Sequence, residues 1–484
     1  MGNTAKLSAS DRIATLLDDN SFVEVGAYVT KRSTDFNLQQ KEVPADGVIT
    51  GYGLVDGNPV YVYSQDASAL NGTVGEMHAK KIVHIYELAL KVGAPVIGLV
   101  DCAGLRLQEA TDALNGFGEI YLKKTLASGV IPQITAIFGA CGGGLAVLSS
   151  LSDFTFMEKT QAKLFVNTPN ALLGNYTAKC DTSSASYQAK TGLVDVVADD
   201  DASVLAKVRD LVSVLPANNF EDSSYTECED DLNRVVPAFA QEVEDSVEAL
   251  KDISDSNYFF EVKAEYAKEM VTGFIRLNGA TVGAVANRTA VKDGDGKVTT
   301  KFDGSLSTAA CEKAAKFVNF CDAFQIPVLS LTNVTGFKAT VEEEKTIADA
   351  AAKLTYAFAN ATVPKINVIV GKAYGSAYVS MNSKHIGADF VFATEDAKIG
   401  MMDAKAAAKI MYSAEIEVAT DAVKVIDEKA AEYEKLQSSA MAAAKRGYVD
   451  SIIDAASVRK QVIYGFEMLA TKCESRPEKK HSTF

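Results

Sequence analysis

The stretch Gln133-Ile-Thr-Ala-Ile-Phe-Gly-Ala-Cys-Gly-Gly-Gly144 decides the fold of this chain. It is an uncharged, largely apolar run that ends in three consecutive glycines. A matching stretch, Lys365-Ile-Asn-Val-Ile-Val-Gly-Lys-Ala-Tyr-Gly-Ser376, follows later in the chain. Apolar runs of this length are typical of buried strands, and glycines let the backbone turn sharply or approach another group closely. Each stretch therefore predicts a buried strand, a glycine turn and a packed helix.

The spacing from Gln133 to Lys365 also separates other pairs of matching residues, which lie within these stretches and on either side of them. Most of them are Gly or Pro, which fix backbone geometry rather than add bulk. The matching pairs are Gly72 and Gly304, Lys81 and Lys313, Pro95 and Pro327, Gly104 and Gly336, Pro132 and Pro364, Gly139 and Gly371, and Gly143 and Gly375. Two copies of one backbone bring two copies of any site that the backbone builds. The repeat therefore predicts two similar pockets that face two ligands.

Within each copy, the predicted elements alternate between strands and helices. Copy one reads as a hairpin around Asp56-Gly57, a helix over 75–90, a buried strand and then the glycine-turn stretch. Copy two has the same order, with a longer loop at 292–301 that copy one lacks. Strands that alternate with helices indicate βαβ units, and 484 residues exceed what one core usually serves. We expect an α/β protein of two domains, 1–250 and 251–484, related by internal duplication.

Composition and charge exclude several classes of function. The net charge of −15 argues against nucleic acid as a partner, because nucleic acid would need an extended basic face. The seven Cys are scattered singly and no cluster of metal ligands is evident, so we expect reduced thiols in a cytoplasmic protein and no metal. The uncharged run 134–151 is interrupted by glycines and predicts no membrane span. The Ala-, Glu- and Lys-rich segment 406–444 predicts a helical arm that docks a partner or a second copy.

Each glycine turn opens a helix, and this position offers chemistry from the backbone alone. Successive N–H groups at the start of a helix bind an anion, or an oxygen on which negative charge develops. The alternative is tight packing of strand against helix, but two turns in the same register favour an oxyanion site. The four histidines, His78, His84, His385 and His481, accompany no nucleophile, and Ser376 lies outside a nucleophile-elbow motif. We therefore expect the chemistry to depend on backbone electrostatics.

Six stretches, spread over nearly the whole chain from Arg12, form a recognisable set. They are Gly75-Glu-Met-His-Ala-Lys-Lys81, Leu105-Arg-Leu-Gln-Glu109, Ala127-Ser-Gly-Val-Ile-Pro-Gln133, Lys316-Phe-Val-Asn-Phe-Cys-Asp-Ala-Phe-Gln-Ile-Pro327, Ala361-Thr-Val-Pro-Lys-Ile366 and Lys372-Ala-Tyr-Gly-Ser-Ala-Tyr378. This set resembles the carboxyltransferase subunit of biotin-dependent acyl-CoA carboxylases and decarboxylases. The resemblance implies two tandem crotonase-like domains, each a ββα superhelix.

The resemblance also implies where two ligands bind. The N-terminal domain would hold acyl-CoA, and the C-terminal domain of a partner subunit would hold biotin. The implied acyl-CoA residues are Gly104, Leu105, Arg106 and Gly142, with the Gly143 and Gly144 amides at the thioester oxygen; the implied biotin residues are Gly336, Phe337, Tyr374 and Gly375, with the Ser376 and Ala377 amides at the ureido or carboxyl oxygen. Arg106, Lys80 and Lys81 are candidates for the CoA phosphates. A solvated helix face is the alternative for the two lysines, and we favour it.

The implied mechanism needs no side-chain base. Carboxybiotin releases CO2, the freed ureido nitrogen takes the α-proton of the acyl-CoA, and the first pair of amides stabilises the thioester enolate. Biotin would arrive on a separate protein, because the chain has no Met-Lys-Met attachment motif. The implied partners are a biotin carboxyl carrier protein, a biotin carboxylase or a membrane decarboxylase subunit, and further copies of this chain in a dimer or a dimer-based hexamer. The resemblance leaves the acyl group and the direction of the reaction open.

Two other functions stay open at this stage. A hydratase or isomerase that acts on CoA thioesters would need paired Glu residues near the first glycine turn, and none follows that turn before Glu158. A non-catalytic scaffold is favoured only by Ser376 and Thr335, which replace residues usual in the family. Carboxyl transfer between biotin and a short-chain acyl-CoA is the function that we predict.

Overall fold

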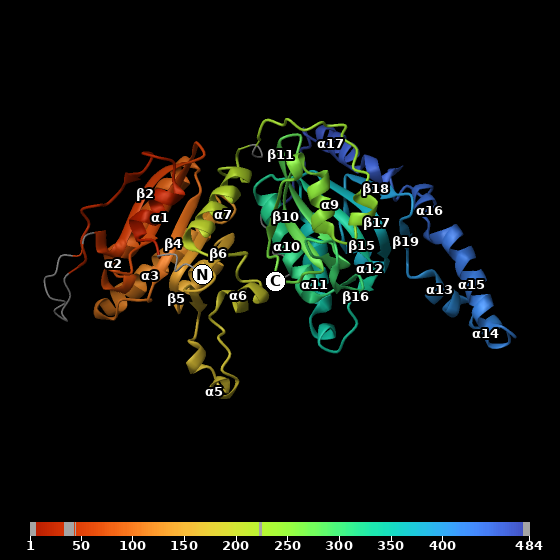
Figure 1. Ribbon diagram of the computed structural model, residues 1–484, viewed down its shortest axis with the longest axis horizontal. Helices are drawn as coiled ribbons and strands as arrows, with labels where there is room; N and C mark the ends of the chain where they lie inside the picture. The colour runs from red at the N-terminus through yellow and green to blue at the C-terminus, as the bar shows by residue number, and fades with distance from the viewer. Residues whose placement is uncertain (1–5, 33–42, 44, 222–224, 478–484) are drawn as a thin grey trace. The chain divides into compact units, whose positions relative to one another are not determined.

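The computed structural model describes residues 6–32, 43, 45–221 and 225–477. The chain forms two compact units, Met1–Ser224 and Tyr225–Phe484 (Figure 1). The boundary that we placed at residue 250 falls inside α9 (Ser246–Ile253). The buried face of α9 belongs to the hydrophobic core of the second unit, and the segment before it is bound there too. The second unit therefore begins before residue 251, where we expected it to begin.

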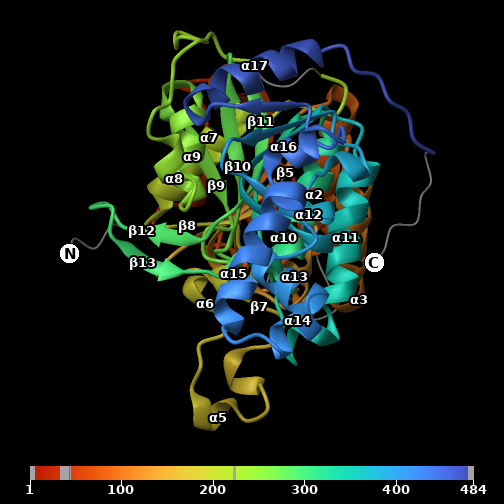
Figure 2. The ribbon, with the colours of Figure 1, turned by 90° about the vertical axis from the view of Figure 1, so that its right-hand side faces the viewer.

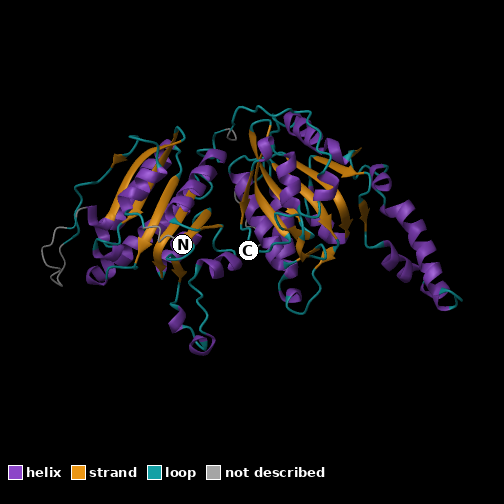
Figure 3. Ribbon diagram, in the orientation of Figure 1, coloured by secondary structure: helices purple, strands orange, loops and turns teal. Residues whose placement is uncertain are grey.

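The first unit contains a mixed sheet with helices packed on it (Figure 3). Its strand order is β1-β2-β3-β4-β5-β6-β8, and β7 pairs with β5. β2 and β3 form the antiparallel hairpin predicted around Asp56-Gly57, whose positive φ angles of 49° and 81° suit a two-residue turn. From β3 onward the neighbours are parallel. The strands are β1 Val23–Glu24, β2 Val48–Val55, β3 Asn58–Gln65, β4 Val96–Cys102, β5 Gln133–Gly142, β6 Phe154–Glu158, β7 Lys163–Phe165 and β8 Val196–Ala198.

Helices form most of the connections between these parallel strands. The predicted helix over 75–90 is α2, which begins after the N-cap Gly75 and ends at Gly93 in the left-handed conformation. α2 packs beside α3, and the buried Ile82, Ile85 and Ile120 join the core over the sheet. The helices are α1 Ala9–Leu16, α2 Glu76–Val92, α3 Ala110–Ala127, α4 Gly144–Ser150, α5 Asn175–Ala178, α6 Ala185–Thr191 and α7 Asp201–Val214.

The second unit repeats this plan. Its strand order is β20-β18-β17-β15-β11-β10-β9, and β19 pairs with β17. An antiparallel hairpin, β10 and β11, again leads into parallel strands. The predicted insertion at 292–301 forms the small antiparallel pair β12–β13, which projects from the sheet (Figure 2). The strands are β9 Phe259–Val262, β10 Met270–Leu277, β11 Ala280–Asn287, β12 Ala290–Lys292, β13 Val298–Lys301, β14 Ser305–Leu306, β15 Val328–Val334, β16 Gly336–Phe337, β17 Lys365–Tyr374, β18 Phe390–Thr394, β19 Lys398–Gly400 and β20 Ser451–Ile453.

The helices of the second unit cover its sheet and extend beyond it. α13, α14 and α15 form an arm that reaches away from the sheet of this unit (Figure 1). Among the described residues, no helix is both long enough and apolar enough to cross a membrane. The helices are α8 Phe239–Glu242, α9 Ser246–Ile253, α10 Thr308–Ala323, α11 Ile347–Asn360, α12 Gly375–Ser380, α13 Ala404–Met411, α14 Ser413–Glu417, α15 Ala422–Tyr433, α16 Ala440–Ala444 and α17 Val458–Met468.

The duplication that the sequence predicted is present in the backbone. When the offset between the two glycine turns is added to the bounds of β4, it gives the bounds of β15. The same addition to the bounds of β5 gives the bounds of β17. α2 and α10 begin at that offset too. The two central strands of each sheet and the helix that precedes them are therefore one structural unit used twice, which confirms the expected α/β fold with two related domains.

Candidate functional site

Both glycine-turn strands carry the same β-bulge just before the turn. In the first unit, Val100 pairs with Ile137, but the next pair is Cys102 with Cys141, so β5 gains two residues over β4. In the second unit, the step from Thr332 to Val334 on β15 faces the step from Ile369 to Ala373 on β17. Bulges of this kind bend a strand and change the direction of the residues that follow. The ends of β5 and β17 therefore leave their sheets in the same way.

Each bulged strand leads into a short helix through a glycine with positive φ. Gly143, the N-cap of α4, has φ 62° and ψ −125°, and Gly375 has φ 60°. Residues with a Cβ rarely adopt this backbone conformation. The sequence pattern predicted these two turns correctly, because the conformation requires glycine at that position in both copies.

In the first unit, the free backbone donors lie one residue later than we expected. The Gly143 N–H donates to Phe165 O on β7 at 2.8 Å, so this amide is engaged within the protein. Within the described part of the chain, the N–H groups of Gly144 and Leu145 have no acceptor. Tyr121 Oη donates to Gly144 O at 2.8 Å and holds this turn against α3. The first turn of α4 therefore presents Gly144 and Leu145, and not Gly143, as donors.

The second unit presents the equivalent pair of donors. The repeat pairs Ser376 and Ala377 with Gly144 and Leu145, and among the described groups none accepts from their N–H groups either. Ser376 is exposed, whereas Tyr374 and Ala377 are buried. The two pairs that we assigned from the sequence, 143–144 and 376–377, do not occupy equivalent positions in the repeat, because they differ by one residue. The free amides of the structure, 144–145 and 376–377, do occupy equivalent positions.

The remaining implied ligand residues lie in equivalent loops at the ends of β4 and β15. An isolated parallel bridge joins Val74 to Leu105 in the first unit. In the second unit, β14 pairs with β16, which consists of Gly336 and Phe337, and β16 packs against α12. Gly336 and Phe337 therefore lie close to α12, the helix that contains Ser376.

Arg106 does not point to solvent. Its side chain is 2% exposed, and Nη1 lies 2.7 Å from both Asp46 Oδ1 and Glu109 Oε1. Nη2 donates to Thr73 O at 2.8 Å. The other Glu109 oxygen accepts from the Glu76 N–H at the start of α2. Two carboxylates and a carbonyl thus surround the guanidinium, which supports a structural role rather than the expected contact with CoA phosphates.

The two candidate lysines have different environments. Lys80 is half exposed and pairs with Glu76 on its own helix, which agrees with the solvated face that we favoured. Lys81 is 5% exposed, and its Nζ donates to Ala45 O and Val48 O, so the same interpretation is wrong for this residue. Lys313, its copy in α10, donates in the same way to Lys263 O and Tyr266 O. The repeated lysine therefore holds each helix to backbone carbonyls of the segment beside it.

The histidines offer no acid–base group at either turn. His78 is fully buried, its backbone N–H and ring contact Asp46 and Gln65, and burial lowers its pKa to about 3. His385 packs against the rings of Tyr378 and Tyr448. His84 is exposed, and His481 lies outside the described residues. Among the described residues, no three His, Cys, Asp or Glu side chains are grouped so that they could hold a metal ion.

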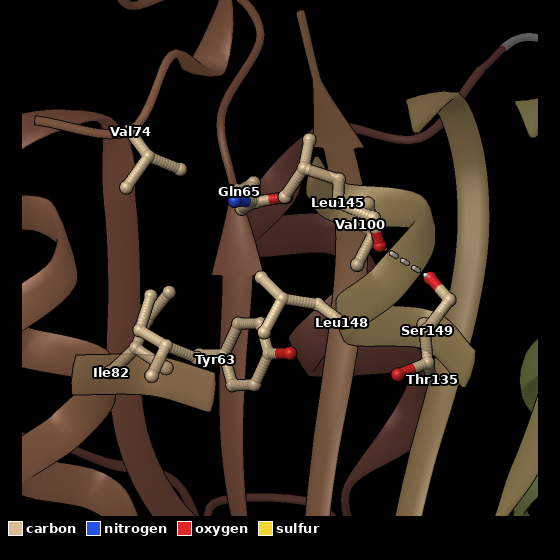
Figure 4. Close-up of a pocket in the computed structure, with 10 residues that line it drawn as sticks. Tyr63, Gln65, Val74, Ile82, Val100, Thr135, Leu145, Leu148 and Ser149 are labelled. Carbon is tan, nitrogen blue, oxygen red and sulfur yellow. Dashed lines mark hydrogen bonds between the residues drawn. The ribbon is translucent and has the colours of Figure 1, made fainter. Parts of the chain in front are cut away.

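A closed cavity lies beneath α4, between this helix and the sheet. Its lining includes Tyr63, Gln65, Leu145 and Ser149, and Ser149 Oγ donates to Leu145 O at 3.2 Å (Figure 4). The cavity measures about 10 Å³, which is the space of about one water molecule. Gln65 Oε1 has no partner among the described groups and would accept from such a water. The cavity is too small for an acyl chain, so the free N–H groups in the first turn of α4 remain the candidate site.

Two residues of the site escaped the sequence analysis. Asp101 and Asn333 occupy the bulges, and their side chains lie against Gly139 and Gly371. They are separated by the same offset as the glycine pairs, but one is Asp and the other Asn, so a search for identical residues passes over them. A search for similar residues at that offset would have found both.

Comparison with known proteins agrees with this description. The sequence profile of the Carboxyl transferase domain matches residues 3–484. The propionyl-CoA carboxylase beta chain of Roseobacter denitrificans is 40% identical over 488 residues, which cover 98% of this chain and 93% of that protein. The methylmalonyl-CoA decarboxylase subunit alpha of Propionigenium modestum is 38% identical over 490 residues, which cover 99% of this chain and 93% of that protein.

A solved structure has the same fold. The crystal structure of transcarboxylase 12S, described as a hexamer with hydrolysed methylmalonyl-coenzyme A bound, superposes with a TM-score of 0.91 at 37% identity. The match covers 99% of this chain and 92% of the other, and it bears out the two tandem crotonase-like domains. Family profile, sequence relatives and fold thus agree over the full length: the chain belongs to the Carboxyl transferase domain family, a family of enzymes.

Proposed function

We propose that this chain transfers a carboxyl group between biotin, presented by a separate carrier protein, and a short-chain acyl-CoA. The observation that carries the proposal is the repeated pair of free amides, Gly144 with Leu145 and Ser376 with Ala377, at the two glycine turns. A carboxyl transfer has two carbonyl-type oxygens to stabilise, one on each substrate. Two equivalent cradles on one chain fit two such oxygens.

The first cradle acts on the thioester. Loss of the α-proton, or of the carboxyl group in the reverse direction, places negative charge on the thioester oxygen. The Gly144 and Leu145 N–H groups donate to that oxygen, and no reorganisation is needed because Tyr121 and Phe117 hold the turn. One well-placed donor of this kind lowers the barrier by about 3–4 kcal/mol. Gly104 and Leu105, at the end of β4, form the neighbouring wall of the acyl site.

The second cradle accepts the biotin ring. Ser376 and Ala377 donate N–H groups to the ureido or carboxyl oxygen, and Gly336, Phe337 and Tyr374 form an apolar surface for the rest of the ring. A Cβ on Gly336 would meet no atom within 4 Å, so there is space beside this loop for a ligand. Biotin supplies the ureido nitrogen that carries the carboxyl group, and the protein residues position it and stabilise charge.

The names of the relatives support a short acyl group. Propionyl-CoA and methylmalonyl-CoA appear among them, in carboxylases as well as in a decarboxylase. We propose propionyl-CoA with methylmalonyl-CoA as the first pair to test, a biotin carboxyl carrier protein as the obligatory partner, and a biotin carboxylase or a membrane decarboxylase subunit as the second partner. We also propose a hexamer in the cytoplasm, as for the transcarboxylase 12S structure, which is described as a hexamer.

A hydratase or isomerase is the weaker candidate. It would need a carboxyl group free to move protons near the first cradle, and Glu158 is the nearest Glu after it in the sequence. Glu158 is buried, and its oxygens accept hydrogen bonds from Thr160, Gln161 and Ala162. Burial acts to raise its pKa, but these hydrogen bonds outweigh burial and lower it, so the group stays ionised and engaged in its own turn. It does not serve as a free acid or base.

The test is a transfer experiment with a labelled carboxyl group. Carboxybiotin on its carrier protein, labelled in the carboxyl carbon, is incubated with this chain and a panel of acyl-CoA compounds. Label in a CoA product supports carboxyl transfer. Turnover of an unsaturated acyl-CoA with water and without biotin would indicate a hydratase, and an absence of any turnover would indicate a scaffold.

A matched pair of variants tests the second cradle. Ser376→Pro removes the N–H donor at a position in the first helical turn where proline is tolerated, whereas Ser376→Ala keeps the donor. We expect Ser376→Pro to lower the transfer rate by a factor on the order of 100 to 1000 and Ser376→Ala to leave it nearly unchanged. Equal rates for the two variants would show that the amide has no role.

A further inference from the structure

We propose that Asp101 and Asn333 are positioning residues, each of which fixes the β-bulge that aims the amide cradle of its unit. The inference rests on the proposed function, because it concerns where the cradles point. Asp101 is on β4 and Asn333 is on β15, and each lies opposite the additional residues of the bulged strand, β5 or β17. Each stands between the last regular strand pair and the pair that follows the bulge. In each unit this side chain is also the group nearest to the glycine of the bulge, Gly139 or Gly371.

In the second unit, the Asn333 side chain replaces a missing strand partner. Its Oδ1 accepts from the Lys372 N–H at 3.0 Å, an amide of β17 that lies in the bulge. The Asn333 N–H in turn donates to Asn287 Oδ1 at 3.0 Å. A Cβ on Gly371 would lie 2.5 Å from Asn333 Oδ1, so glycine is needed there to admit the amide. The side chain thus satisfies and shapes the bulge at once.

In the first unit, Asp101 fills the same place with a charged group. A Cβ on Gly139 would overlap the Asp101 carboxylate, so these two residues are matched in the same way. The carboxylate is 7% exposed and pairs with Lys6 at 2.7 Å and with Arg12 at 3.3 Å. Arg12 is buried and also pairs with Asp201. The bulge of the first unit is therefore fixed to α1 and α7 by an ion-pair network.

The bulge lies close enough to the cradle to set its direction. Only Ala140, Cys141 and Gly142 separate Gly139 from the turn at Gly143, and Lys372, Ala373 and Tyr374 occupy the same places in the second unit. Both segments are extended strand, so a change in the direction of the bulge also changes the direction of the residues that follow it. Loss of the side chain would let the bulge relax toward a regular ladder and rotate the donors that follow. Misplacement of a reacting group by about 1 Å can reduce a rate by a factor of about 100.

The experiment compares Asn333→Ala, which removes the acceptor, with Asn333→Asp, which keeps an acceptor at the same place. Asn319→Ala is the matched control, because Asn319 is an exposed amide on α10 of the same unit. Transfer of labelled carboxyl from the carrier to propionyl-CoA is measured at varied concentrations of each substrate, on folded protein quantified by circular dichroism.

We expect Asn333→Ala to reduce kcat by a factor on the order of 10 to 100 while the KM for propionyl-CoA, which binds the other unit, changes little. Asn333→Asp should recover most of kcat, and Asn319→Ala should match the wild type. A variant Asn333→Ala that transfers at the wild-type rate overturns the inference. A wild type that transfers no label overturns the proposed function instead. If Asn333→Ala does not fold, Asn333→Ser is measured in its place, since the shorter side chain also leaves the Lys372 N–H without its acceptor.

Discussion

Lys81 and Lys313 hold equivalent places in the two units, and in both the ammonium group is buried against backbone carbonyls. Burial without a paired carboxylate disfavours the charged form. It lowers the pKa of Lys81 to about 8 and that of Lys313 to about 7. These side chains hold the helices α2 and α10 to the neighbouring segments. Their charge lowers the stability of the folded state by an amount that depends on pH.

We expect Lys81→Met to remove part of the pH dependence of unfolding. The folded-state pKa of Lys81 is about 8, and an ordinary lysine in the unfolded chain has a pKa near 10.4. Between these values the unfolded state binds more protons, so the free energy of unfolding of the wild type rises with pH across that window. Chemical denaturation from about pH 7 to about pH 10.5 should show the wild type gaining stability over Lys81→Met as pH rises.

Lys80→Met is the matched control for this measurement. Lys80 is the adjacent residue on the same helix, but it is half exposed and pairs with Glu76. The difference in stability between the wild type and Lys80→Met should not rise over the same pH window. A constant difference between the wild type and Lys81→Met would contradict burial as the origin of the effect.

We expect Arg106→Met to destabilise the first unit without a specific loss of acyl-CoA affinity. The substitution leaves the Asp46 and Glu109 carboxylates buried without their cation, which costs about 3–5 kcal/mol. Arg32→Met is the control, because Arg32 is half exposed and its loss should matter far less. The measurements are thermal unfolding and the KM for acyl-CoA of the folded fraction; a large rise in KM with unchanged stability would restore Arg106 as a ligand residue.

At the residue scale, the sequence predicted backbone conformation correctly, but it did not predict which partners surround a side chain or an amide. Gly143 and Gly375 were predicted correctly because their backbone conformation admits little else. Arg106 was misinterpreted because its partner Asp46 is 60 residues away in the sequence, and only the fold brings them together. The engagement of the Gly143 amide depends in the same way on Phe165 of β7. Partners from distant segments decide which groups are free, and a local pattern does not contain them.

At the scale of elements, the repeated order was predictable and several boundaries were not. α2, β4, β5 and the hairpins lie where the sequence placed them, because apolar runs and turn residues define them. The start of α3 at Ala110 is an example. The start is set by contacts of the preceding turn, where Glu109 bonds to Arg106 and to α2. Gly116 and Gly118 lie inside α3, where tertiary packing outweighs the low helix propensity of glycine.

We expect residues 293–297, the tip of the β12–β13 hairpin, to be dispensable for folding. Copy one lacks it, and the β13 residues are mostly exposed. Replacing residues 293–297 by Asn-Gly, which closes the hairpin with a two-residue turn, should change the free energy of unfolding by less than about 1 kcal/mol. Thermal unfolding and the transfer assay measure this. Unchanged stability with a raised KM for the carrier protein would instead identify the hairpin as a contact for that partner.

At the scale of the whole molecule, the duplication supports the proposal that one chain serves two substrates. Each unit supplies a bulged strand, a positive-φ glycine and two free amides, and the side chains around them differ between the units. The Asp101 ion pairs of the first unit, for example, become the neutral Asn333 contacts of the second. The sequence predicted the duplicated plan because glycine positions carry it, and it predicted a helical arm at 406–444 because that segment is rich in Ala, Glu and Lys.

The helical arm is where we expect assembly to be decided. Ile410 on α13, Val418 after α14 and Val423 on α15 are 67%, 86% and 69% exposed, which is unusual for large apolar side chains on neighbouring helices. The hexamer described for transcarboxylase 12S supports burial of this surface by further copies of the chain.

Light scattering after size exclusion should give a mass that is a multiple of the 51.5 kDa chain. Ile410→Glu combined with Val423→Glu should lower that mass, because each carboxylate would be buried in the contact. Ser413→Glu, which places a carboxylate at an exposed polar position of the same arm, should leave the mass unchanged. An unchanged mass for the double variant would move the contact to another surface.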